Sequence, residues 1–357
     1  MSNTIGERIR VTVFGQSHAP SIGAVIEGLP AGMEIDMERV KAFMARRAPG
    51  QNALSTARKE KDEPKIISGL NEWGRTCGAP LCMVIENTDM RSKDYSSLRD
   101  LPRPGHADYT AAVKFGGEND VRGGGQFSGR LTAPICFAGA VCLQLLEERG
   151  VRIGAHIASI ADVDDELFDI PDEALLDEIA AHSFPVIDEQ AGLRMQERIL
   201  AAKAEGDSVG GIIEVCAINV PAGIGDPMFD GIENSLARAA FGIPAVRGVE
   251  FGCGFAAARM RGSQHNDAFC MGPDGQVKTK TNRHGGVLGG ITSGMPIVMR
   301  AAIKPTPSIA NEQQTVSLKK QADDRLIIEG RHDPCIVQRA VPCFEAIMAL
   351  AIADKIV

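Results

Sequence analysis

The stretch NRHGGVLGGITSGMPIVMRAAIKPTPSI, residues Asn282–Ile309, constrains the fold more than any other part of the chain. Two glycine pairs, Gly285-Gly286 and Gly289-Gly290, precede an apolar run from Ile297 to Ile303 whose residues suit a buried strand. Lys304 follows that run and opens a proline-punctuated loop. Glycines let a ligand approach the backbone closely, and a lysine beside hydroxyl groups can hold an anion. Taken alone, the stretch favours a phosphate or cofactor cradle about as much as a plain glycine-rich connection between strands.

A second glycine cradle, DVRGGGQFSGR, spans Asp120–Arg130 and precedes an apolar segment that predicts a long helix over Leu131–Arg149. Glycines and a serine just before a helix N-terminus form an anion site from backbone amides and the helix dipole. No Gly-Lys-Ser/Thr follows, so the segment is not a Walker P-loop, and its spacing does not match a Rossmann fingerprint.

Strands and helices are predicted to mix along the whole chain, with no linker or low-complexity break. This organisation favours one composite domain over residues 1–357, and the two cradles permit an internal pseudo-symmetry. Asp36 is the expected N-cap of the first helix, and Pro342 should start or kink the last. The predicted strands are Arg8–Phe14, Ile22–Gly28, Leu81–Glu86, Gly211–Pro221 and Val246–Gly252, and the predicted helices are Met37–Arg47, Leu131–Arg149, Asp172–Ala181, Asp188–Glu205, Gly231–Phe241 and Cys335–Ile356, with Arg259–Asp267 as a polar loop.

The charge pattern argues for a small anionic ligand rather than nucleic acid. The net charge is −8, but 11 acidic residues lie within Asp162–Glu189, which is expected to be a solvated face, and the rest of the chain has a small basic excess. Aromatic residues make up only 4% of the chain, too few for a platform that stacks bases. Basic side chains gather instead beside glycine-rich turns, at Arg46, Arg47, Arg103, Arg122, Arg130, Arg283, Lys304, Arg331 and Arg339.

The N-terminus lacks an apolar signal core and no run of 18 apolar residues occurs, so we expect a cytoplasmic protein that does not enter a membrane. Nine cysteines are dispersed without a CxxC pair. Their odd number and apolar neighbours favour reduced thiols over disulfides or zinc, and no metal site is predicted.

Two histidines stand in glycine-containing loops beside basic residues. His18 follows Gly15-Gln16-Ser17, and His106 lies in the loop Arg103–Asp108. A lone loop histidine is more often solvated than catalytic, and arginines at a helix C-terminus, such as Arg47, ordinarily complement the dipole. The setting that the two histidines share makes both of them candidates.

Seven motifs in order make the sequence similar to the chorismate synthase family over nearly its full length. They are FGQSH (Phe14–His18), RPGHADY (Arg103–Tyr109), RGGGQFSGRLT (Arg122–Thr132), VPAGIGDPMFD (Val220–Asp230), RHGGVLGGITSG (Arg283–Gly294), KPTPS (Lys304–Ser308) and GRHDPCIVQRAVP (Gly330–Pro342). The resemblance implies an α+β fold of one domain, with helices between two antiparallel sheets, assembled as a homotetramer. It also implies conversion of 5-enolpyruvylshikimate 3-phosphate to chorismate and phosphate, an anti-1,4-elimination that requires reduced FMN without net redox change.

The resemblance assigns three catalytic residues. His18 matches the histidine placed to protonate the departing phosphate, and His106 matches the one that protonates reduced flavin near its N1–C2 edge. Asp333 matches the aspartate that helps flavin N5 take the substrate proton. From the residues alone, Asp333 also suits the N-cap of a helix that begins near Cys335.

The resemblance further implies two sets of binding residues. The positions that match flavin contacts are Ser128, Gly289, Lys304, Pro305, Thr306, Pro307, Ser308 and Arg331. The positions that match contacts to the anionic substrate are Arg47, Arg130 and Arg339. Basic loops in a net acidic protein agree with a substrate that carries a phosphate and two carboxylates.

The chain departs from the family pattern at five positions. Gln16 and Ala19 replace a glutamate and a glycine around the first histidine, Ala53 replaces an arginine thought to contact substrate or nucleotide, Gln126 an arginine beside flavin, and Pro244 an asparagine that touches the cofactor. These changes affect the binding assignments more than the reaction.

Two other classes remain open, a catalytically inactive flavin- or phosphate-binding relative and a flavin oxidoreductase. The source of electrons, NADPH used directly or a separate flavin reductase, is not determined by the sequence.

Overall fold

The computed structural model describes residues 3–50, 54, 62–87, 97–273, 275–328 and 332–357. An antiparallel sheet forms near the N-terminus, because alternating residues such as Ile22, Ala24 and Ile26 turn one face of each strand to the core. The strands, in the order in which they pair, are β1 (Thr4–Ile5), β2 (Arg10–Gly15), β3 (Ser21–Glu27), β5 (Leu81–Glu86) and β4 (Lys65–Ser68).

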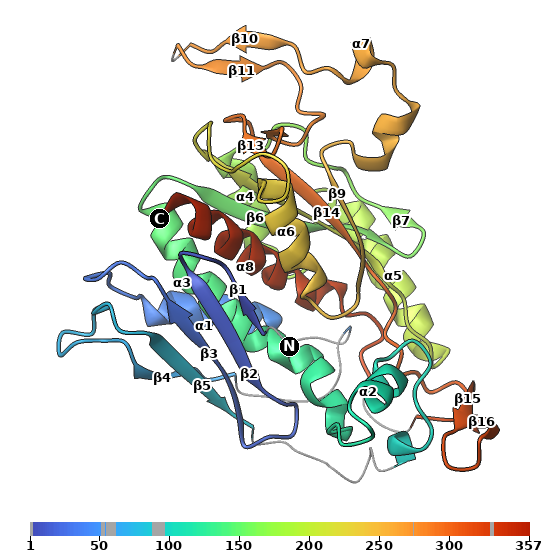
Figure 1. The fold of residues 1–357 in the computed structure, drawn as a ribbon. Helices are drawn as coiled ribbons and strands as arrows, with labels where there is room; N and C mark the ends of the chain where they lie inside the picture. Colours follow the sequence, from blue (N-terminus) through green and yellow to red (C-terminus); the bar gives the residue numbers. More distant parts are fainter. Residues whose placement is uncertain (1–2, 51–53, 55–61, 88–96, 274, 329–331) are drawn as a thin grey trace.

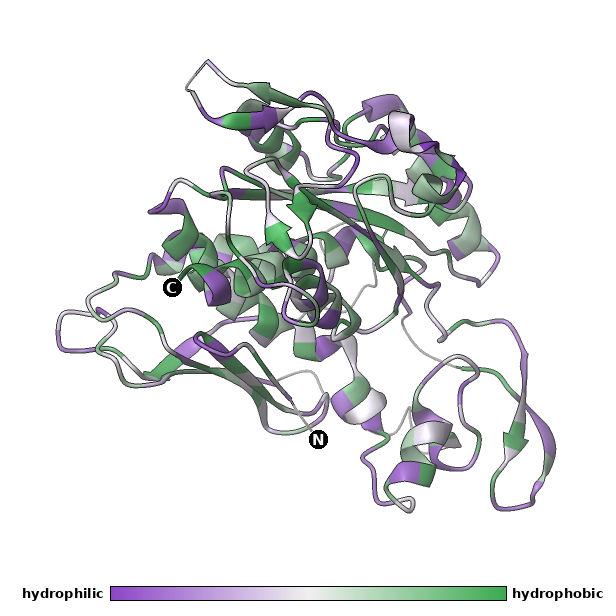
Figure 2. Ribbon diagram, turned by 45° about the horizontal axis from the view of Figure 1, so that its top comes forward, coloured by the Kyte–Doolittle hydropathy of each residue, from purple (hydrophilic) through white to green (hydrophobic). Residues whose placement is uncertain are grey.

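A second antiparallel sheet lies on the other side of a helix layer (Figure 1). Its strands pair in the order β7 (Val163–Asp164), β6 (Arg152–Ile160), β8 (Gly211–Ile218), β14 (Ile297–Ile303) and β9 (Val246–Phe251). Between the sheets lie α1 (Met37–Arg47), α3 (Thr132–Glu147), α6 (Ile232–Phe241) and α8 (Val337–Ile356), and hydrophobic residues gather on these helices and on the strands that flank them (Figure 2). The expected α+β sandwich is confirmed.

The two halves of the chain repeat one topology. The first half runs β2-β3-α1-β4-β5-α3, and the second runs β6-β8-α6-β9-β14-α8. Corresponding strands take the same places in their sheets, β2-β3-β5-β4 and β6-β8-β14-β9. The internal pseudo-symmetry that the sequence permits is therefore present in the topology. In both halves the last connection from strand to helix is long and carries several of the candidate site residues.

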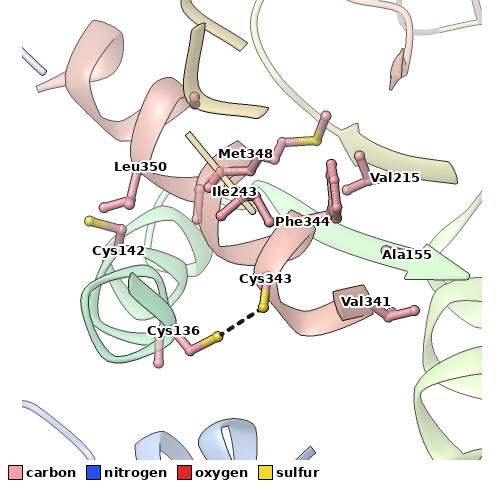
Figure 3. Close-up of a cluster of buried hydrophobic side chains, with 14 of the residues drawn as sticks. Cys136, Cys142, Ala155, Val215, Ile243, Val341, Cys343, Phe344, Met348 and Leu350 are labelled. Atoms are coloured by element: carbon pink, nitrogen blue, oxygen red, sulfur yellow. Dashed lines mark hydrogen bonds between the residues drawn. The ribbon is translucent and has the colours of Figure 1, made fainter. Parts of the chain in front are cut away.

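The last helices of the two halves, α3 and α8, pack side by side and run in the same direction. Cys136 Sγ and Cys343 Sγ are 3.7 Å apart (Figure 3), and one turn further along a β-carbon at Gly139 would overlap the β-carbon of Ala346. In both pairs the two residues are 207 positions apart in the sequence. A constant separation from one turn to the next means that the two helices run parallel. The N-termini of α3 and α8 therefore lie at the same end of the molecule.

The remaining elements lie outside this sandwich. Near the site they are α2 (Asp108–Lys114), β15 (Gln313–Ser317) and β16 (Ala322–Leu326); elsewhere they are α4 (Glu173–Ala181), α5 (Glu189–Ala204), α7 (Gly262–His265), β10 (Phe269–Met271), β11 (Val277–Thr279), β12 (Val287–Leu288) and β13 (Ile291–Thr292). In the described part of the chain, one helical stretch, Gly129–Glu147, is long and apolar enough to cross a membrane, but 78% of it is buried inside the molecule, as expected of a core helix.

Several sequence predictions need correction. The strand β6 was not predicted, because it is buried on both faces and shows no alternation; its Gly154 leaves room for Leu176 of α4. The acidic segment is not wholly a solvated face, since the Asp165 side chain is fully buried and accepts from the Ile187 amide at 2.7 Å. The polar loop contains the short helix α7, and Val337 rather than Cys335 or Pro342 starts α8.

Candidate active site

The first histidine loop packs against the glycine-rich turn η2 (Arg122–Phe127). His18 lies between β2 and β3 and is only 4% exposed. A β-carbon at Gly123 would lie 2.5 Å from His18 Nδ1, and Gly123 has a φ of +59°, a left-handed conformation that favours glycine. The Ser17 amide donates to the Gly125 carbonyl at 3.1 Å. The position of the second cradle that lies against His18, Gly123, therefore requires glycine.

The second histidine loop packs against the next residue of the same turn. A β-carbon at Gly124 would lie 3.2 Å from His106 Nε2. His106 Nδ1 lies 2.6 Å from Asp108 Oδ1, and Arg103 donates to both oxygens of that carboxylate, at 2.7 and 2.9 Å. Burial alone would raise the pKa of Asp108, but Arg103 and His106 hold that pKa well below its usual range. The turn η2 thus brings His18 and His106 to adjacent backbone positions.

Two buried arginines lie at the start of α3 and share one carboxylate. Arg47 Nη1 donates to Asp62 Oδ2 at 2.9 Å, and Arg130 Nη1 donates to Asp62 Oδ1. Burial would raise the pKa of Asp62, but the two guanidinium groups lower it below its ordinary value. Arg130 Nε also donates to Asn87 Oδ1 at 3.1 Å, and Asn87 Nδ2 donates to the Ala19 carbonyl at 2.7 Å. These contacts join the arginines to the His18 loop.

Arg339 and Asp333 extend the cluster at the start of α8. Arg339 Nη1 donates to Asp333 Oδ2 at 2.6 Å, and Arg339 Nε donates to the Arg47 carbonyl at 3.0 Å. The N-cap of α8 is Ile336, which makes no side-chain capping bond. The alternative in which Asp333 caps the last helix is therefore wrong, and the carboxylate is bound to Arg339 instead.

Two features of the site end of the molecule favour the binding of an anion. The parallel helices α3 and α8 direct the positive ends of their dipoles toward it, and Arg47, Arg130 and Arg339 lie at those N-termini. Ser128, in the turn before α3, accepts from the Arg130 amide at 3.3 Å. An arrangement of this kind can bind an anion.

The loop after β14 lies beside the His106 loop. Lys304 Nζ donates to the Gly105 carbonyl, and Ser308 Oγ accepts from Arg103 Nη1 at 3.1 Å. Burial, with Arg247 and then Arg103 nearby, lowers the pKa of Lys304. Pro305 and Pro307 frame Thr306, whose Oγ1 is buried and has no hydrogen-bond partner among the described residues. A buried hydroxyl without a partner is costly unless a ligand supplies one.

The chain matches one family over almost its whole length. The family model described as Chorismate synthase matches residues 9–357. The chorismate synthase of Korarchaeum cryptofilum (strain OPF8) is 47% identical over 351 residues, which cover 98% of this chain and 96% of that protein. The chorismate synthase of Pyrococcus abyssi (strain GE5 / Orsay) is 48% identical over 352 residues, with the same coverage of 98% and 96%.

The chain belongs to the chorismate synthase family. A solved structure, "Crystal Structure of Chorismate Synthase", aligns with a TM-score of 0.76 at 28% identity and covers 98% of this chain and 92% of that chain. Membership makes the protein an enzyme of the shikimate pathway, a carbon–oxygen lyase that acts on a phosphate-bearing substrate and forms chorismate. The family assignment made from the motifs is confirmed.

The chorismate synthase motifs do not form one continuous cradle. Gly289 turns between β12 and β13 and lies near the N-terminus of α6, where the Ile232 amide donates to the Gly290 carbonyl at 3.0 Å. Lys304 lies at the other end of β14, which has seven residues and is therefore roughly 20 Å long. Within this chain the stretch from Asn282 to Ile309 therefore does not form a single cradle, and the binding roles of Gly289 and Lys304 stay predictions. Arg331 and Ala53 lie outside the described residues.

The structure adds three polar residues that sequence reasoning did not select. Asp62 joins Arg47 and Arg130, Asn87 joins Arg130 to the His18 loop, and Asp108 binds His106. The position of Asp108, two residues after a loop histidine, was a usable signal. Asp62 gave no signal, because it stands in a charged run and meets its partners only in the folded chain.

Proposed function

We propose that this site eliminates phosphate from 5-enolpyruvylshikimate 3-phosphate to give chorismate. The observation that carries the proposal is the convergence of Arg47, Arg130 and Arg339 on the paired N-termini of α3 and α8, beside the buried His18. Three guanidinium groups and two helix dipoles match a substrate with one phosphate and two carboxylates. His18 would hold the proton that the departing phosphate takes, and the packing of Gly123 on its ring keeps water away.

Reduced FMN is the cofactor that we propose for this elimination. The residues fit such a group, because the Thr306 Oγ1 atom is buried without a partner and Lys304 is a cation beside two hydroxyl groups. Ser128, Lys304, Pro305, Thr306, Pro307 and Ser308 would hold it, and Gly289 and Arg331 remain predictions. When bound, reduced FMN would supply the electron-rich ring that lets the elimination proceed without net redox change.

The chain's own proton carriers complete the proposal. His106 would hold a proton at Nε2, the nitrogen that faces the glycine turn. The Asp333 carboxylate, positioned by Arg339, would help to remove the proton that the substrate ring loses. Arg47 and Arg130 would bind the anionic groups of the substrate and hold it in a reactive orientation.

The test is chorismate formation under anaerobic conditions with FMN reduced beforehand by dithionite. Turnover without stoichiometric flavin oxidation is expected, whereas a flavin oxidoreductase would oxidise one flavin per turnover. His18→Gln should slow turnover by roughly 10²-fold or more while reduced FMN still binds. His182→Gln is the matched control, since that side chain is 28% exposed and pairs only weakly with Glu189. Failure of the wild-type protein to form chorismate would overturn the proposal.

We also propose that the chain forms one domain and assembles as a cytoplasmic homotetramer. One buried cluster includes residues of both sheets and of the helices between them, which supports a single domain. Light scattering should give a mass near four times 38.0 kDa, and an active monomer would contradict the assembly. Aerobic assays with FMN and NADPH, with and without an added flavin reductase, would show whether NADPH serves this enzyme directly.

A further inference from the structure

A buried pair of charges surrounds His106, and the proposed reaction assigns neither member a role. The side chains of Arg103 and Asp108 are 6% and 4% exposed, and that of His106 is 15% exposed. Arg103 binds Asp108 through its backbone amide at 3.1 Å as well as through its guanidinium group. Such burial is costly for charged groups unless they are fully paired, and here the pairing is arranged around the imidazole.

The geometry determines which nitrogen of His106 carries a proton. The Asp108 carboxylate is ionised, because Arg103 donates to both of its oxygens, and an ionised carboxylate only accepts hydrogen bonds. His106 Nδ1 lies 2.6 Å from Asp108 Oδ1 and must therefore be the donor. Nε2 is left as the nitrogen that gains and loses a proton, and it is the nitrogen nearest to Gly124.

Arg103 and Asp108 favour opposite states of that nitrogen. The Asp108 carboxylate, in contact with Nδ1, stabilises the charged imidazolium. Arg103 Nη2 lies 3.1 Å from Nδ1 and 3.3 Å from Nε2, so its positive charge lies against the ring and opposes the imidazolium. We propose that Asp108 and Arg103 are positioning residues that fix one tautomer of His106 and balance its two protonation states, so that Nε2 can both release and recover a proton at the proposed flavin site.

The same pair connects the histidine to the loop after β14. Arg103 Nη1 donates to Ser308 Oγ, and Lys304 Nζ donates to the Gly105 carbonyl next to His106. A ligand held by Lys304 and Ser308 would therefore lie beside Nε2. Several charged and titratable groups surround His106. Arg103 and Asp108 lie on its own segment, and Lys304 comes from the loop after β14. His332 interacts electrostatically with Arg103, and His18 and Asp120 lie around η2.

The first experiment uses the ligand-free full-length protein and does not depend on the proposed function. Diethyl pyrocarbonate modifies neutral imidazole, so peptide mass spectrometry across a pH series gives the pH at which His106 becomes reactive. In Asp108→Asn this pH should fall by about one unit or more, and in Arg103→Gln it should rise. His182 in the same digests is the internal control. Asp100→Asn is the matched control variant, since Asp100 accepts from Lys319 and Ser317 in the same loop region.

The second experiment, which rests on the proposed function, measures chorismate formation with pre-reduced FMN across pH. Asp108→Asn should lower kcat by roughly tenfold or more, with a smaller change in KM, and should move the alkaline limb of the profile to lower pH. In a His106→Gln background, Asp108→Asn should add little, because a positioning residue acts through the residue that it positions. Additive losses would overturn the inference.

The outcomes separate the two proposals. If wild-type protein forms no chorismate but the reactivity of His106 moves as expected, the proposed function fails and the positioning inference stands. Unchanged reactivity in folded Asp108→Asn overturns the inference, whatever the activity. Should Asp108→Asn not fold, Arg103→Gln provides the test, because it must move the pH of reactivity upward. A shift in the same direction in both variants would also overturn the balance of opposing charges.

Discussion

The backbone of Gly123 lies against the imidazole of His18 so closely that a β-carbon there would be 2.5 Å from Nδ1. Gly123→Ala should therefore displace the ring as well as strain a left-handed residue, at a conformational cost of about 1 kcal/mol. A shift of about 1 Å in a catalytic group can lower the rate by about 10²-fold. We expect turnover in the anaerobic chorismate assay to fall by about that factor while reduced FMN still binds.

The control for this variant lies in the same loop. A β-carbon at Gly129 would meet no heavy atom within 4 Å, so Gly129→Ala should reduce turnover far less than Gly123→Ala. Equal losses in the two variants would mean that the loop as a whole, rather than its contact with His18, determines activity.

The contact between Gly139 and Ala346 gives a prediction about stability. An added methyl group would force α3 and α8 apart, and overpacking of this kind costs about 1–3 kcal/mol. Gly139→Ala should lower the free energy of unfolding in urea by that amount. Adding Ala346→Gly should recover part of the loss, less about 1 kcal/mol for a second glycine within a helix. If the double variant recovered no stability, a clash with Ala346 would not be the cause of the loss.

Most of the helices and strands that recur in the two halves could be predicted from the sequence, because amphipathic periodicity and capping residues are local signals. Asp36 caps α1 as expected, accepting from the Glu38 and Arg39 amides at 3.0 and 3.1 Å. The strand β6 gave no such signal, since a strand buried on both faces loses its alternation. The layer arrangement came from the family resemblance, not from periodicity.

The candidate site was predictable residue by residue but not as an arrangement. His18, His106 and Arg130 were selected from their motifs, yet their proximity depends on η2, whose three consecutive left-handed glycines have no periodic signature. Gly289 and Lys304 belong to one continuous stretch of the sequence, but β14 separates them. The pairing of Asp62 with Arg47 and Arg130 is a long-range consequence of folding that no local pattern contains.

Asp62 should make stability depend on acid pH. Its folded-state pKa is lowered below the unfolded value, so its carboxylate stabilises the fold above the unfolded pKa of about 4, and this contribution is lost as pH falls through the lower folded value. Asp62→Asn should cost about 3 kcal/mol in urea unfolding at pH 7, and the difference from wild type should shrink below about pH 4. Asp162→Asn is the control, because Asp162 pairs with Arg198 at the surface and its loss should change stability far less than the loss of Asp62.

Lys304 should make flavin affinity depend on alkaline pH. Burial and the neighbouring Arg247 and Arg103 lower the pKa of Lys304, so its charge is lost at a lower pH than that of a surface lysine. Titration with reduced FMN should show affinity that declines with rising pH in wild type and less so in Lys304→Arg, which keeps its charge. Lys304→Ala should lose about 1.5–3 kcal/mol of binding at neutral pH without a comparable loss of stability. Equal affinities in all three proteins would remove Lys304 from the proposed site.

Asp333 gives the sharpest test of the proposed chemistry. Ile336 rather than Asp333 is the N-cap of α8, and the structure shows Asp333 in an ion pair with Arg339. The side chains of Asp333 and Arg339 are 15% and 18% exposed. Asp333→Asn can keep a hydrogen bond to Arg339 but cannot act as a base. We expect Asp333→Asn to melt within a few degrees of wild type, to bind reduced FMN and substrate, and to turn over at least roughly tenfold more slowly.

Arg339→Met distinguishes the base from the ion pair. It removes the same pair from the other side and leaves the Asp333 carboxylate in place, so a purely structural pair predicts matching losses of stability and turnover in the two variants. A catalytic carboxylate predicts different losses instead: Arg339→Met should mainly weaken substrate binding and raise KM, whereas Asp333→Asn should mainly lower kcat. With FMN already reduced by dithionite, flavin reduction cannot limit either rate. Near-normal chorismate formation by Asp333→Asn under those conditions would leave Asp333 with only the structural role of orienting Arg339.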